Sequence, residues 1–360
     1  MLKTSPAVFA VGHEYQIMFY TEGAAFVSVR VGESEFFDES NGIMRSLRNI
    51  HRIAVPMTLL DSARAYTVVE EKVIERLPYF SKTEPVVEHR YDFVPVPEKG
   101  ARAFHIADAH GQTDGPVAAC AAFGDVDFLI FNGDILNDSG NPDNFYNIYD
   151  MASRITGGTK PVIFSRGNHD LRGIHAESFA DYTPNRAGYT YYTFRLGSVW
   201  GIVLDCGENK NDDRAEYGHS VRCHPFRLRE TEYIKSVIAD AEHEYLAPGV
   251  ETRLVIVHNP FTRQLGDPFN IEVELYTEWA RMLRENVKPH LMICGHVHTF
   301  DIDEVGGKHD QLGQPCTVVT SSYLASGISG GTGFVFGDDG IEVAFTLANG
   351  ESRGREILGK

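Results

Sequence analysis

The chain has 360 residues, which is long for one average domain, and its apolar content of 42% suffices for sizeable cores. Its formal net charge of −17 at pH 7 disfavours binding to a nucleic-acid backbone, and no stripe of Lys or Arg offsets that charge. No apolar run approaches the ~20 residues that cross a bilayer, so we expect no membrane partner.

The N-terminus and the cysteines favour a reducing, cytoplasmic location. Residues 1–6 lack the charged segment and apolar stretch of a secretory signal. The five cysteines are odd in number and include no Cys-x-x-Cys pair. That pattern argues against a disulfide framework and against a thiolate zinc site.

The first 95 residues differ in pattern from the rest of the chain. They contain short β-branched or aromatic runs that Gly, Asn, Asp and Ser separate, at residues 8–20, 25–31, 50–56, 66–74 and 86–93. This spacing predicts a small all-β sandwich over residues 1–95, of the fibronectin or immunoglobulin kind as a resemblance given below implies. The Pro-rich stretch that follows predicts a linker over residues 96–102.

From residue 103 onward, strand-like and helix-like segments alternate. Apolar strands are expected at residues 103–107, 127–132 and 161–165, and helices at 115–123 and 143–156. Such β-α-β-α-β alternation predicts a parallel sheet that helices cover.

The remaining segments continue this mixed pattern. A hairpin is expected over 189–205 with its turn at Gly197-Ser198, followed by helices at 227–246 and 271–286 and strands at 253–257 and 290–294. Four strand-like stretches close the chain, at residues 299–305, 315–321, 332–337 and 340–347. The expected class is therefore α/β.

Five polar motifs follow the carboxyl ends of predicted strands. In open α/β sheets this edge is where binding sites are built. The motifs are Asp108-Ala109-His110, Gly133-Asp134, Gly167-Asn168-His169-Asp170, His258 and Gly295-His296-Val297-His298.

Each motif alone has an ordinary explanation. An Asp-x-His triplet arises by chance in a chain of this length, and a lone histidine such as His258 is more often a core residue than a ligand. Gly133-Asp134 alone would most often be a turn with a helix N-cap. A His-x-His strand places both imidazoles on one face, yet such strands also occur without metal.

Together the motifs indicate a metal centre. They offer two Asp, four His and one Asn, which are O and N donors that suit Mn, Fe, Zn or Co. The set is too large for one tetrahedral ion and matches two ions ~3.5–4 Å apart with a bridging carboxylate. The glycines before Asp134, Asn168 and His296 are expected to allow sharp turns into one pocket.

The order D-x-H, G-D, G-N-H-D, H, G-H-x-H resembles the calcineurin-like metallophosphoesterase superfamily over residues 103–300. The resemblance implies a catalytic domain over 103–360 with four layers, in which two mixed β-sheets are flanked by helices. It also implies two metal ions per chain. The first would bind Asp108, His110 and His298, the second would bind Asn168, His258 and His296, and Asp134 would bridge them.

In that family the histidine of G-N-H acts on the leaving group, which makes His169 the candidate acid. Asp170 is expected to orient the His169 imidazole, as a carboxylate does when it sets a tautomer. A hydroxide bridging both ions would attack phosphorus in line.

The segment from Gly167 to Asp213 resembles bacterial phosphatase-like members and places Arg172 beside the site. Its guanidinium could hold a phosphate oxygen, or it could form a surface salt bridge, and the sequence favours neither.

The N-terminal sandwich resembles the domain that precedes the catalytic domain of purple acid phosphatases. Those enzymes have D-x-G and G-D-x-x-Y motifs, whereas the matching positions here are His110 and Asn137. A tyrosinate bound to iron is therefore not expected.

The sequence predicts a dinuclear metal-dependent phosphohydrolase that acts on a small phosphate ester, with phosphomonoesters first and phosphodiesters second. A scaffold that keeps the fold without activity is the alternative from another class. The role of the sandwich is left open between docking on the catalytic domain, a homodimer contact and binding of a protein partner. We expect specificity to reside in the loops 172–188, 207–226 and 261–270.

Overall fold

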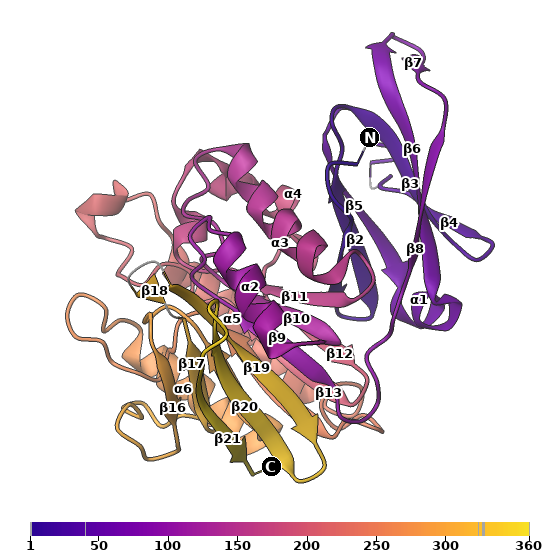
Figure 1. Cartoon of the computed structure of the whole chain (residues 1–360). Coiled ribbons are helices and arrows are strands. Elements are labelled where there is room, and N and C mark those ends of the chain that lie inside the picture. Colours follow the sequence, from indigo (N-terminus) through magenta and orange to yellow (C-terminus); the bar gives the residue numbers. More distant parts are fainter. Residues whose placement is uncertain (1, 40, 323, 326–327, 360) are drawn as a thin grey trace.

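The structure is a computed structural model and describes residues 2–39, 41–322, 324–325 and 328–359. Its strands form three sheets, of ten, six and five strands. Helices lie against the two larger sheets, and the five-stranded sheet stands at one end of the molecule (Figure 1).

The ten-stranded sheet has the order β21-β20-β19-β9-β10-β11-β1-β2-β5, with β18 paired to β19. Strands β9, β10, β11 and β1 run parallel, so their carboxyl ends share one edge. The bounds are β1 Ala7–Val11, β2 Glu14–Tyr20, β5 Ile50–Pro56, β9 Arg102–Ile106, β10 Phe128–Asn132, β11 Pro161–Ser165, β18 Leu324–Ala325, β19 Ile328–Gly337, β20 Gly340–Leu347 and β21 Ser352–Leu358.

The six-stranded sheet has the order β12-β13-β14-β15-β17-β16. Its central strands β13, β14, β15 and β17 are parallel, and β12 and β16 are antiparallel edges. The bounds are β12 Tyr192–Leu196, β13 Val199–Leu204, β14 Thr252–Val257, β15 Leu291–Cys294, β16 Phe300–Asp303 and β17 Val318–Ser321.

The two larger sheets pack face to face and are covered by helices on their outer sides. Ile130 and Ile163 of one sheet share a buried cluster with Ile256 and Ile293 of the other. The outer face of the ten-stranded sheet packs in a second cluster with α2 (Asp114–Phe123) and α3 (Tyr146–Thr156), and the six-stranded sheet packs in a third with α5 (Cys223–Ala239) and α6 (Val273–Met282). The four layers expected from the sequence are confirmed.

Short helices connect these layers. They are α1 Met57–Ala63, α4 Phe179–Tyr182, the 3₁₀ helices η1 Pro142–Phe145, η2 His169–Leu171, η3 Ile174–Ser178 and η4 Ala215–Tyr217, and the π-helical turn η5 Leu283–Val287. Among the described residues, no helix combines the length and the apolar character that crossing a membrane requires.

Two expected elements differ in detail, and one strand was not expected. The run over 8–20 is two strands, because Gly12 turns the chain at φ +58°. The helix expected at 227–246 spans Cys223–Ala239 and gives way to turns. Strand β21 was not predicted, because it is polar and almost fully exposed and therefore shows no alternating pattern.

The N-terminal region is β-rich, as expected, but its strands divide between two sheets. The five-stranded sheet has the order β4-β3-β6-β7, with β8 paired to β6, and the bounds β3 Ala25–Val31, β4 Ser34–Phe36, β6 Ala65–Arg76, β7 Ser81–Thr83 and β8 Val87–Asp92. Strands β1, β2 and β5 instead extend the ten-stranded sheet, because β1 pairs in parallel with β11.

The sequence predicted two domains joined by a linker at residues 96–102 and did not indicate that the two regions share a sheet. Val8 pairs with Pro161 and Phe9 with Val162, so the hydrogen bonding crosses the predicted boundary. An alternating pattern identifies a strand but does not say which strand will be its neighbour. The two regions also share one buried cluster, to which Val29 and Val68 contribute as well as Ile256.

We predict that Phe9→Ala destabilises the catalytic region although Phe9 belongs to the N-terminal region. Phe9 is fully buried and packs edge-on against Tyr149 and Phe164, with ring centroids 6.3 Å apart in both pairs. Removing a buried phenyl ring costs about 3–5 kcal/mol of the free energy of unfolding. Denaturant unfolding followed by tryptophan fluorescence measures this loss, because both tryptophans, Trp200 and Trp279, lie in β13 and α6.

The matched control is Phe80→Ala, since the Phe80 side chain is 62% exposed on the hairpin of β6 and β7. It should leave the midpoint almost unchanged. If Phe9→Ala also leaves the tryptophan midpoint unchanged, the two regions unfold independently and the shared sheet does not couple them.

Candidate metal centre

The loops that follow β9, β10 and β11 meet those that follow β14 and β15, where the carboxyl edges of the two larger sheets come together. Hydrogen bonds between these loops stabilise their arrangement at this edge. The backbone N–H of Asp108 donates to the Gly133 carbonyl at 3.1 Å, and that of Gly295 donates to the His258 carbonyl at 2.9 Å. The Asn132 amide joins the two sheets, because its Nδ2 donates to the carbonyls of Val257 at 3.3 Å and Ile293 at 3.0 Å.

The first ligand group consists of Asp108, His110 and His298, each with a donor atom within 4.8 Å of the others. Asp108 Oδ1 lies 3.2 Å from His298 Nε2 and 3.9 Å from His110 Nε2. The two imidazoles are stacked, with Nε2 atoms 3.5 Å apart. These are the residues that the resemblance assigned to the first ion.

The second group consists of Asp134, His258 and His296, again with donor atoms within 4.8 Å of one another. Asp134 Oδ2 lies 3.2 Å from His258 Nε2. The opposite nitrogen of His258, Nδ1, lies 2.7 Å from the Asn132 carbonyl. A hydrogen bond from Nδ1 to that carbonyl directs Nε2 into the site, as in histidines that bind metals.

Unpaired buried atoms show that both groups fit cations. Asn168 Oδ1 is buried and has no hydrogen-bond partner among the described residues, and Asp108 Oδ1 and His258 Nε2 are buried beside one another and beside other ligand side chains. Buried polar atoms without partners are rare in native proteins, and an ion is one common explanation. The donors are oxygen and nitrogen atoms without thiolates, a set that suits Mn, Fe or Zn.

The charges of the two carboxylates dominate the electrostatics of the site. Burial alone would raise the pKa of Asp108 and of Asp134, but His258 together with His298 and Ser322 beside Asp108, and with His169 beside Asp134, offsets it, and both pKa values lie below the usual range. Burial likewise would lower the pKa of His258, yet Asp134 and Asp108 raise it to about 10. The site therefore attracts positive charge.

The ligand positions share an unusual backbone conformation. Asp108, His110, Asp134, His296 and His298 all have positive φ, between 45° and 73°. Non-glycine residues adopt this left-handed region at an energetic cost and only where their surroundings enforce it. The strain aims consecutive polar side chains into one volume.

The glycines of the motifs are needed mainly for space. A Cβ on Gly167 would lie 2.2 Å from Asp134 Oδ1, and one on Gly295 would lie 2.6 Å from the Ala107 Cβ. Only Gly133 also has a positive φ, of 78°. Sharp turns were the expected reason for all three glycines, whereas close approach of neighbouring side chains explains Gly167 and Gly295.

His169 lies beside the first ligand group. Its ring centroid is 4.7 Å from that of His110, and its backbone N–H donates to Asp134 Oδ1 at 2.8 Å. The Nδ1 atom lies 3.0 Å from the Asn137 carbonyl, at the position where purple enzymes carry a tyrosine. The backbone of Asn137, rather than its side chain, thus sets the orientation of the imidazole.

Arg172 connects His169 to a buried carboxylate. Its Nε donates to Glu208 Oε1 at 2.8 Å, and its Nη1 lies 2.8 Å from His169 Nε2. A guanidinium can only donate, so His169 Nε2 is the acceptor and the imidazole is neutral in this arrangement. Glu208 is 1% exposed, so the ion pair is anchored in the interior and is not a surface salt bridge.

The hydrogen bonds of Asp170 differ from those expected. Its Oδ2 accepts from the backbone N–H of Gly167 at 2.7 Å and of Asp134 at 3.3 Å. The expected orientation of the His169 imidazole by Asp170 is not what the structure shows, because consecutive residues of the 3₁₀ turn point in different directions. Burial and the Asp134 charge raise the pKa of Asp170 to about 7.

Two residues of the loop after β13 were not singled out from the sequence. Glu208 holds Arg172, and Asn209 Nδ2 lies 3.2 Å from His296 Nε2. The signal was present, because both belong to the Leu-Asp-x-Gly-Glu-x-Lys stretch that resembles phosphatase-like members. The sequence did not indicate the direction of each side chain, because that direction depends on how the loop packs.

Comparison with known proteins agrees with this geometry. The family model described as calcineurin-like phosphoesterase matches residues 101–300, more than half of the chain. The chain belongs to the calcineurin-like phosphoesterase family. This membership makes it a hydrolase that acts on phosphoric esters, and the predictions of family and enzyme class are confirmed.

Solved structures show that the fold of this phosphoesterase recurs at low sequence identity. A purple acid phosphatase, PPD1, from yellow lupin (Lupinus luteus) superposes with a TM-score of 0.63 and 12% identity, over 99% of this chain and 74% of that one. A dimetal phosphatase from Danio rerio gives a TM-score of 0.50 and 13% identity, over 74% of this chain and 99% of that one. No curated protein matches the chain.

We predict that Asn209→Ala weakens the binding of one metal ion to this phosphoesterase. Asn209 Oδ1 is buried without a partner among the described residues, and turning the amide over would let Oδ1 accept a hydrogen bond from His296 Nε2–H. That hydrogen bond would leave His296 Nδ1 free to bind the ion. Losing such a partner typically lowers metal affinity about 10–100-fold.

Competition with a chelator measures the affinity of each ion in the wild type and in the variant. Asn349→Ala, in the exposed turn between β20 and β21, is the matched control and should bind both ions as the wild type does. Unchanged affinities in Asn209→Ala would show that the amide does not support His296.

Proposed function

We propose that this phosphoesterase hydrolyses small phosphomonoesters with two divalent ions bound. The position of Asp134 carries the proposal. Its carboxylate is within 4.8 Å of donor atoms of His258 and His296 on one side and of His110 and His169 on the other. A carboxylate placed between two ligand groups is what a bridging ligand requires.

Each ion would be held by the residues of one ligand group. Asp108, His110 and His298 would hold one ion, His258 and His296 the other, and Asp134 both. Asn168, whose Oδ1 is buried without a partner among the described residues, would join the second ion as the family resemblance implies. Two such ions, of Mn, Fe or Zn, activate water as a nucleophile and neutralise charge on the phosphoryl oxygens.

The remaining chemistry belongs to His169 and Arg172. A phosphate group draws guanidinium donors strongly, so substrate would turn Arg172 toward a phosphoryl oxygen and release His169 Nε2. Nε2, once free, could take up a proton from water, and His169, still held at Nδ1 by the Asn137 carbonyl, would then donate that proton to the departing oxygen. Glu208 would keep the guanidinium within reach of both positions.

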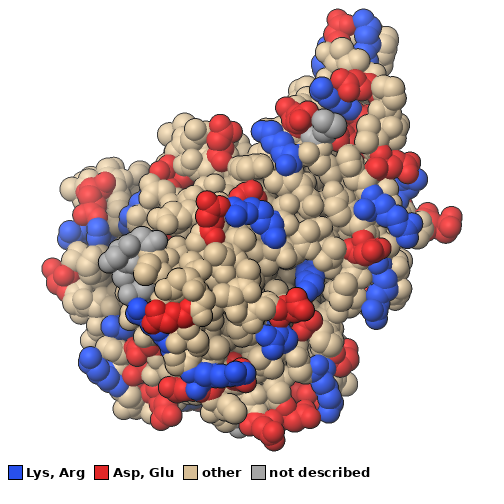
Figure 2. Space-filling model, viewed as in Figure 1, with Lys and Arg blue, Asp and Glu red and all other residues tan. Residues whose placement is uncertain are grey.

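Surface charge favours a small substrate. On the face that Figure 2 shows, Lys and Arg side chains are interspersed with Asp and Glu and form no basic track. A polyanionic substrate would need such a track to bind well. Phosphodiester hydrolysis of a small substrate remains the second candidate, because the ligand set itself serves both ester classes.

The test compares p-nitrophenyl phosphate with its bis-ester on protein loaded with Mn, Fe or Zn. We expect the wild type to hydrolyse the monoester faster than the bis-ester. The Asp134→Asn variant should lose this turnover, because an amide is a poorer bridge between two cations than a carboxylate. Asp339→Asn, an exposed substitution of the same kind, should keep wild-type turnover. Faster turnover of the bis-ester would favour the diesterase, and metal-loaded protein that hydrolyses neither ester would support a scaffold.

The role of His169 can be tested through the leaving group. A proton donor matters most when the leaving oxygen is basic, so His169→Ala should slow an alkyl phosphate by about 10²–10⁴-fold and p-nitrophenyl phosphate much less. His243→Ala, whose side chain is 81% exposed, is the control. Equal losses on the two esters would show that His169 does not protonate the leaving group.

A further inference from the structure

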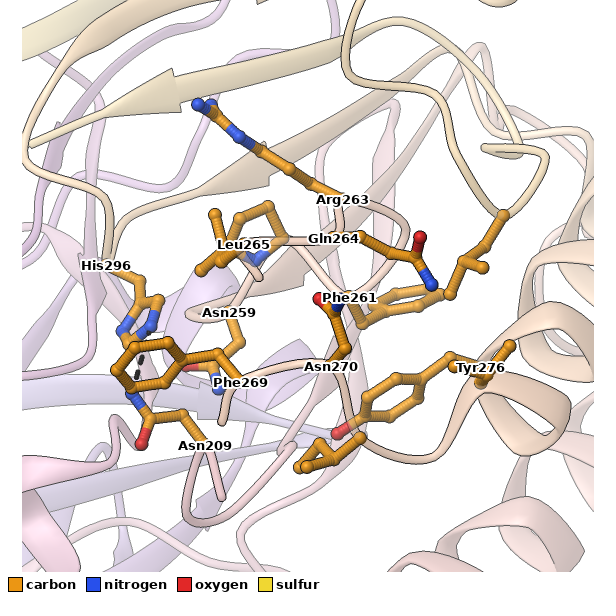
Figure 3. Close-up of a pocket in the computed structure, with 14 residues that line it drawn as sticks. Asn209, Asn259, Phe261, Arg263, Gln264, Leu265, Phe269, Asn270, Tyr276 and His296 are labelled. Carbon is orange, nitrogen blue, oxygen red and sulfur yellow. Dashed lines mark hydrogen bonds between the residues drawn. The ribbon is translucent and has the colours of Figure 1, made fainter. Parts of the chain in front are cut away.

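A pocket adjoins the second ligand group and is not needed to hold either ion. It is lined by His296 and Asn209 and by the loop between β14 and α6, including Phe261, Leu265 and Phe269. Figure 3 shows Phe269, Asn209 and His296 gathered on one side of this pocket. A phosphate held beside His296 would direct its organic group toward the nearest hollow.

No described residue that lines the pocket carries a charged group without an ion-pair partner. Arg263 is its one lining residue with a full charge, and that guanidinium pairs with Asp301 at 3.7 Å and turns away from Phe269 (Figure 3). Lys210, whose Nζ is 5.5 Å from the centroid of the Phe269 ring, pairs with Glu216. A second anionic group on the substrate would find no unpaired cation here, so the pocket suits a neutral group.

The shape and the side chains favour a flat ring. The cavity volume is about 30 Å³, which admits one small substituent, so a ring would stack against Phe269 at the mouth while its substituent enters the hollow. Phe261 and Tyr276 are buried with their ring centroids 5.5 Å apart and form an aromatic floor, whereas the Phe269 side chain is 37% exposed at the mouth. An exposed aromatic ring beside an apolar floor stacks well on another ring.

Amide groups complete the lining. Asn270 Oδ1 accepts from the Gly266 N–H at 3.0 Å, which leaves its amide N–H groups to face the solvent. The side chains of Asn259 and Gln264 make no hydrogen bond to another described residue. Amides donate and accept without charge, so they match neutral polar substituents on a ring.

A second hollow lies beside Arg172 but suits a ring less well. Its lining includes Arg172, Glu208, Lys210 and Glu216, which are paired with one another. Inserting a neutral ring there would strip water from charged groups without replacing their hydrogen bonds. The uncharged pocket beside His296 is the better match.

We propose that the pocket of Phe269, Asn209 and Phe261 binds the organic part of the substrate and selects an uncharged aromatic or heteroaromatic ring. The proposal rests on the proposed phosphohydrolase function, because it assumes that a phosphate group sits at the ligand groups beside His296. Phe269 is then a specificity-determining residue that contacts the ring of the substrate.

Calorimetric titration of the Mn-loaded protein with phenylphosphonate and methylphosphonate tests this without turnover. The wild type should bind phenylphosphonate about tenfold more tightly, as stacking of one ring implies. In Phe269→Ala the two affinities should become nearly equal. Phe80→Ala removes the same ring from an exposed site on the N-terminal hairpin and should keep the tenfold preference.

A wild type without preference, or a Phe269→Ala variant that keeps it, overturns the proposal. Turnover of p-nitrophenyl phosphate, measured on the same samples, separates the two proposals. Turnover without a ring preference would support the proposed phosphohydrolase function and contradict the ring pocket. A ring preference without turnover of any ester would support the pocket as a binding site and contradict the proposed phosphohydrolase function.

Discussion

Two buried carboxylates, Asp108 and Asp134, are the constraint on which the rest of this site depends. They lie within reach of a single imidazole, with His258 Nε2 3.8 Å from Asp108 Oδ1 and 3.2 Å from Asp134 Oδ2. Burying like charges together is strongly unfavourable unless positive charge compensates them. His258 supplies part of that compensation through its raised pKa, and the unpaired atoms around it are arranged for more. A site that needs cations to be stable is also one that can bind phosphate despite the acidic charge of the whole chain.

The two sheets hold these carboxylates in place, and the N-terminal region takes part. Strand β11, which leads to Asn168, lies between β10 and β1, so an N-terminal strand supports one of the ligand loops from the side. Asn132 ties β10 to the carboxyl ends of β14 and β15. The N-terminal region therefore contributes strands to the sheet that carries three of the ligand loops. The strained backbone at five ligand positions persists because this frame leaves the loops little freedom.

One loop, after β13, serves both sides of the centre. Glu208 anchors Arg172 beside His169, while the next residue, Asn209, touches His296 on the opposite side and lines the proposed ring pocket. The two side chains point in different directions, which lets a short segment contact two separate parts of the site. The loop between β14 and α6 then completes the pocket, so the proposed ring site and the ligand groups draw mainly on different loops of the same frame.

The sequence by itself determined the class of fold, the family and the ligand types, because strand ends and motif order are local features of the chain. Asp108, His110, Asp134, His258, His296 and His298 were predicted together and lie together. Only the tertiary structure decided that Asp170 holds the backbone of Gly167 and Asp134, that Arg172 contacts both His169 and Glu208, and that β1 pairs with β11. Each of these contacts joins side chains or strands whose directions depend on packing between distant segments. Spacing along the chain places a residue at a strand end, but the neighbours that surround it are chosen when the sheets pack.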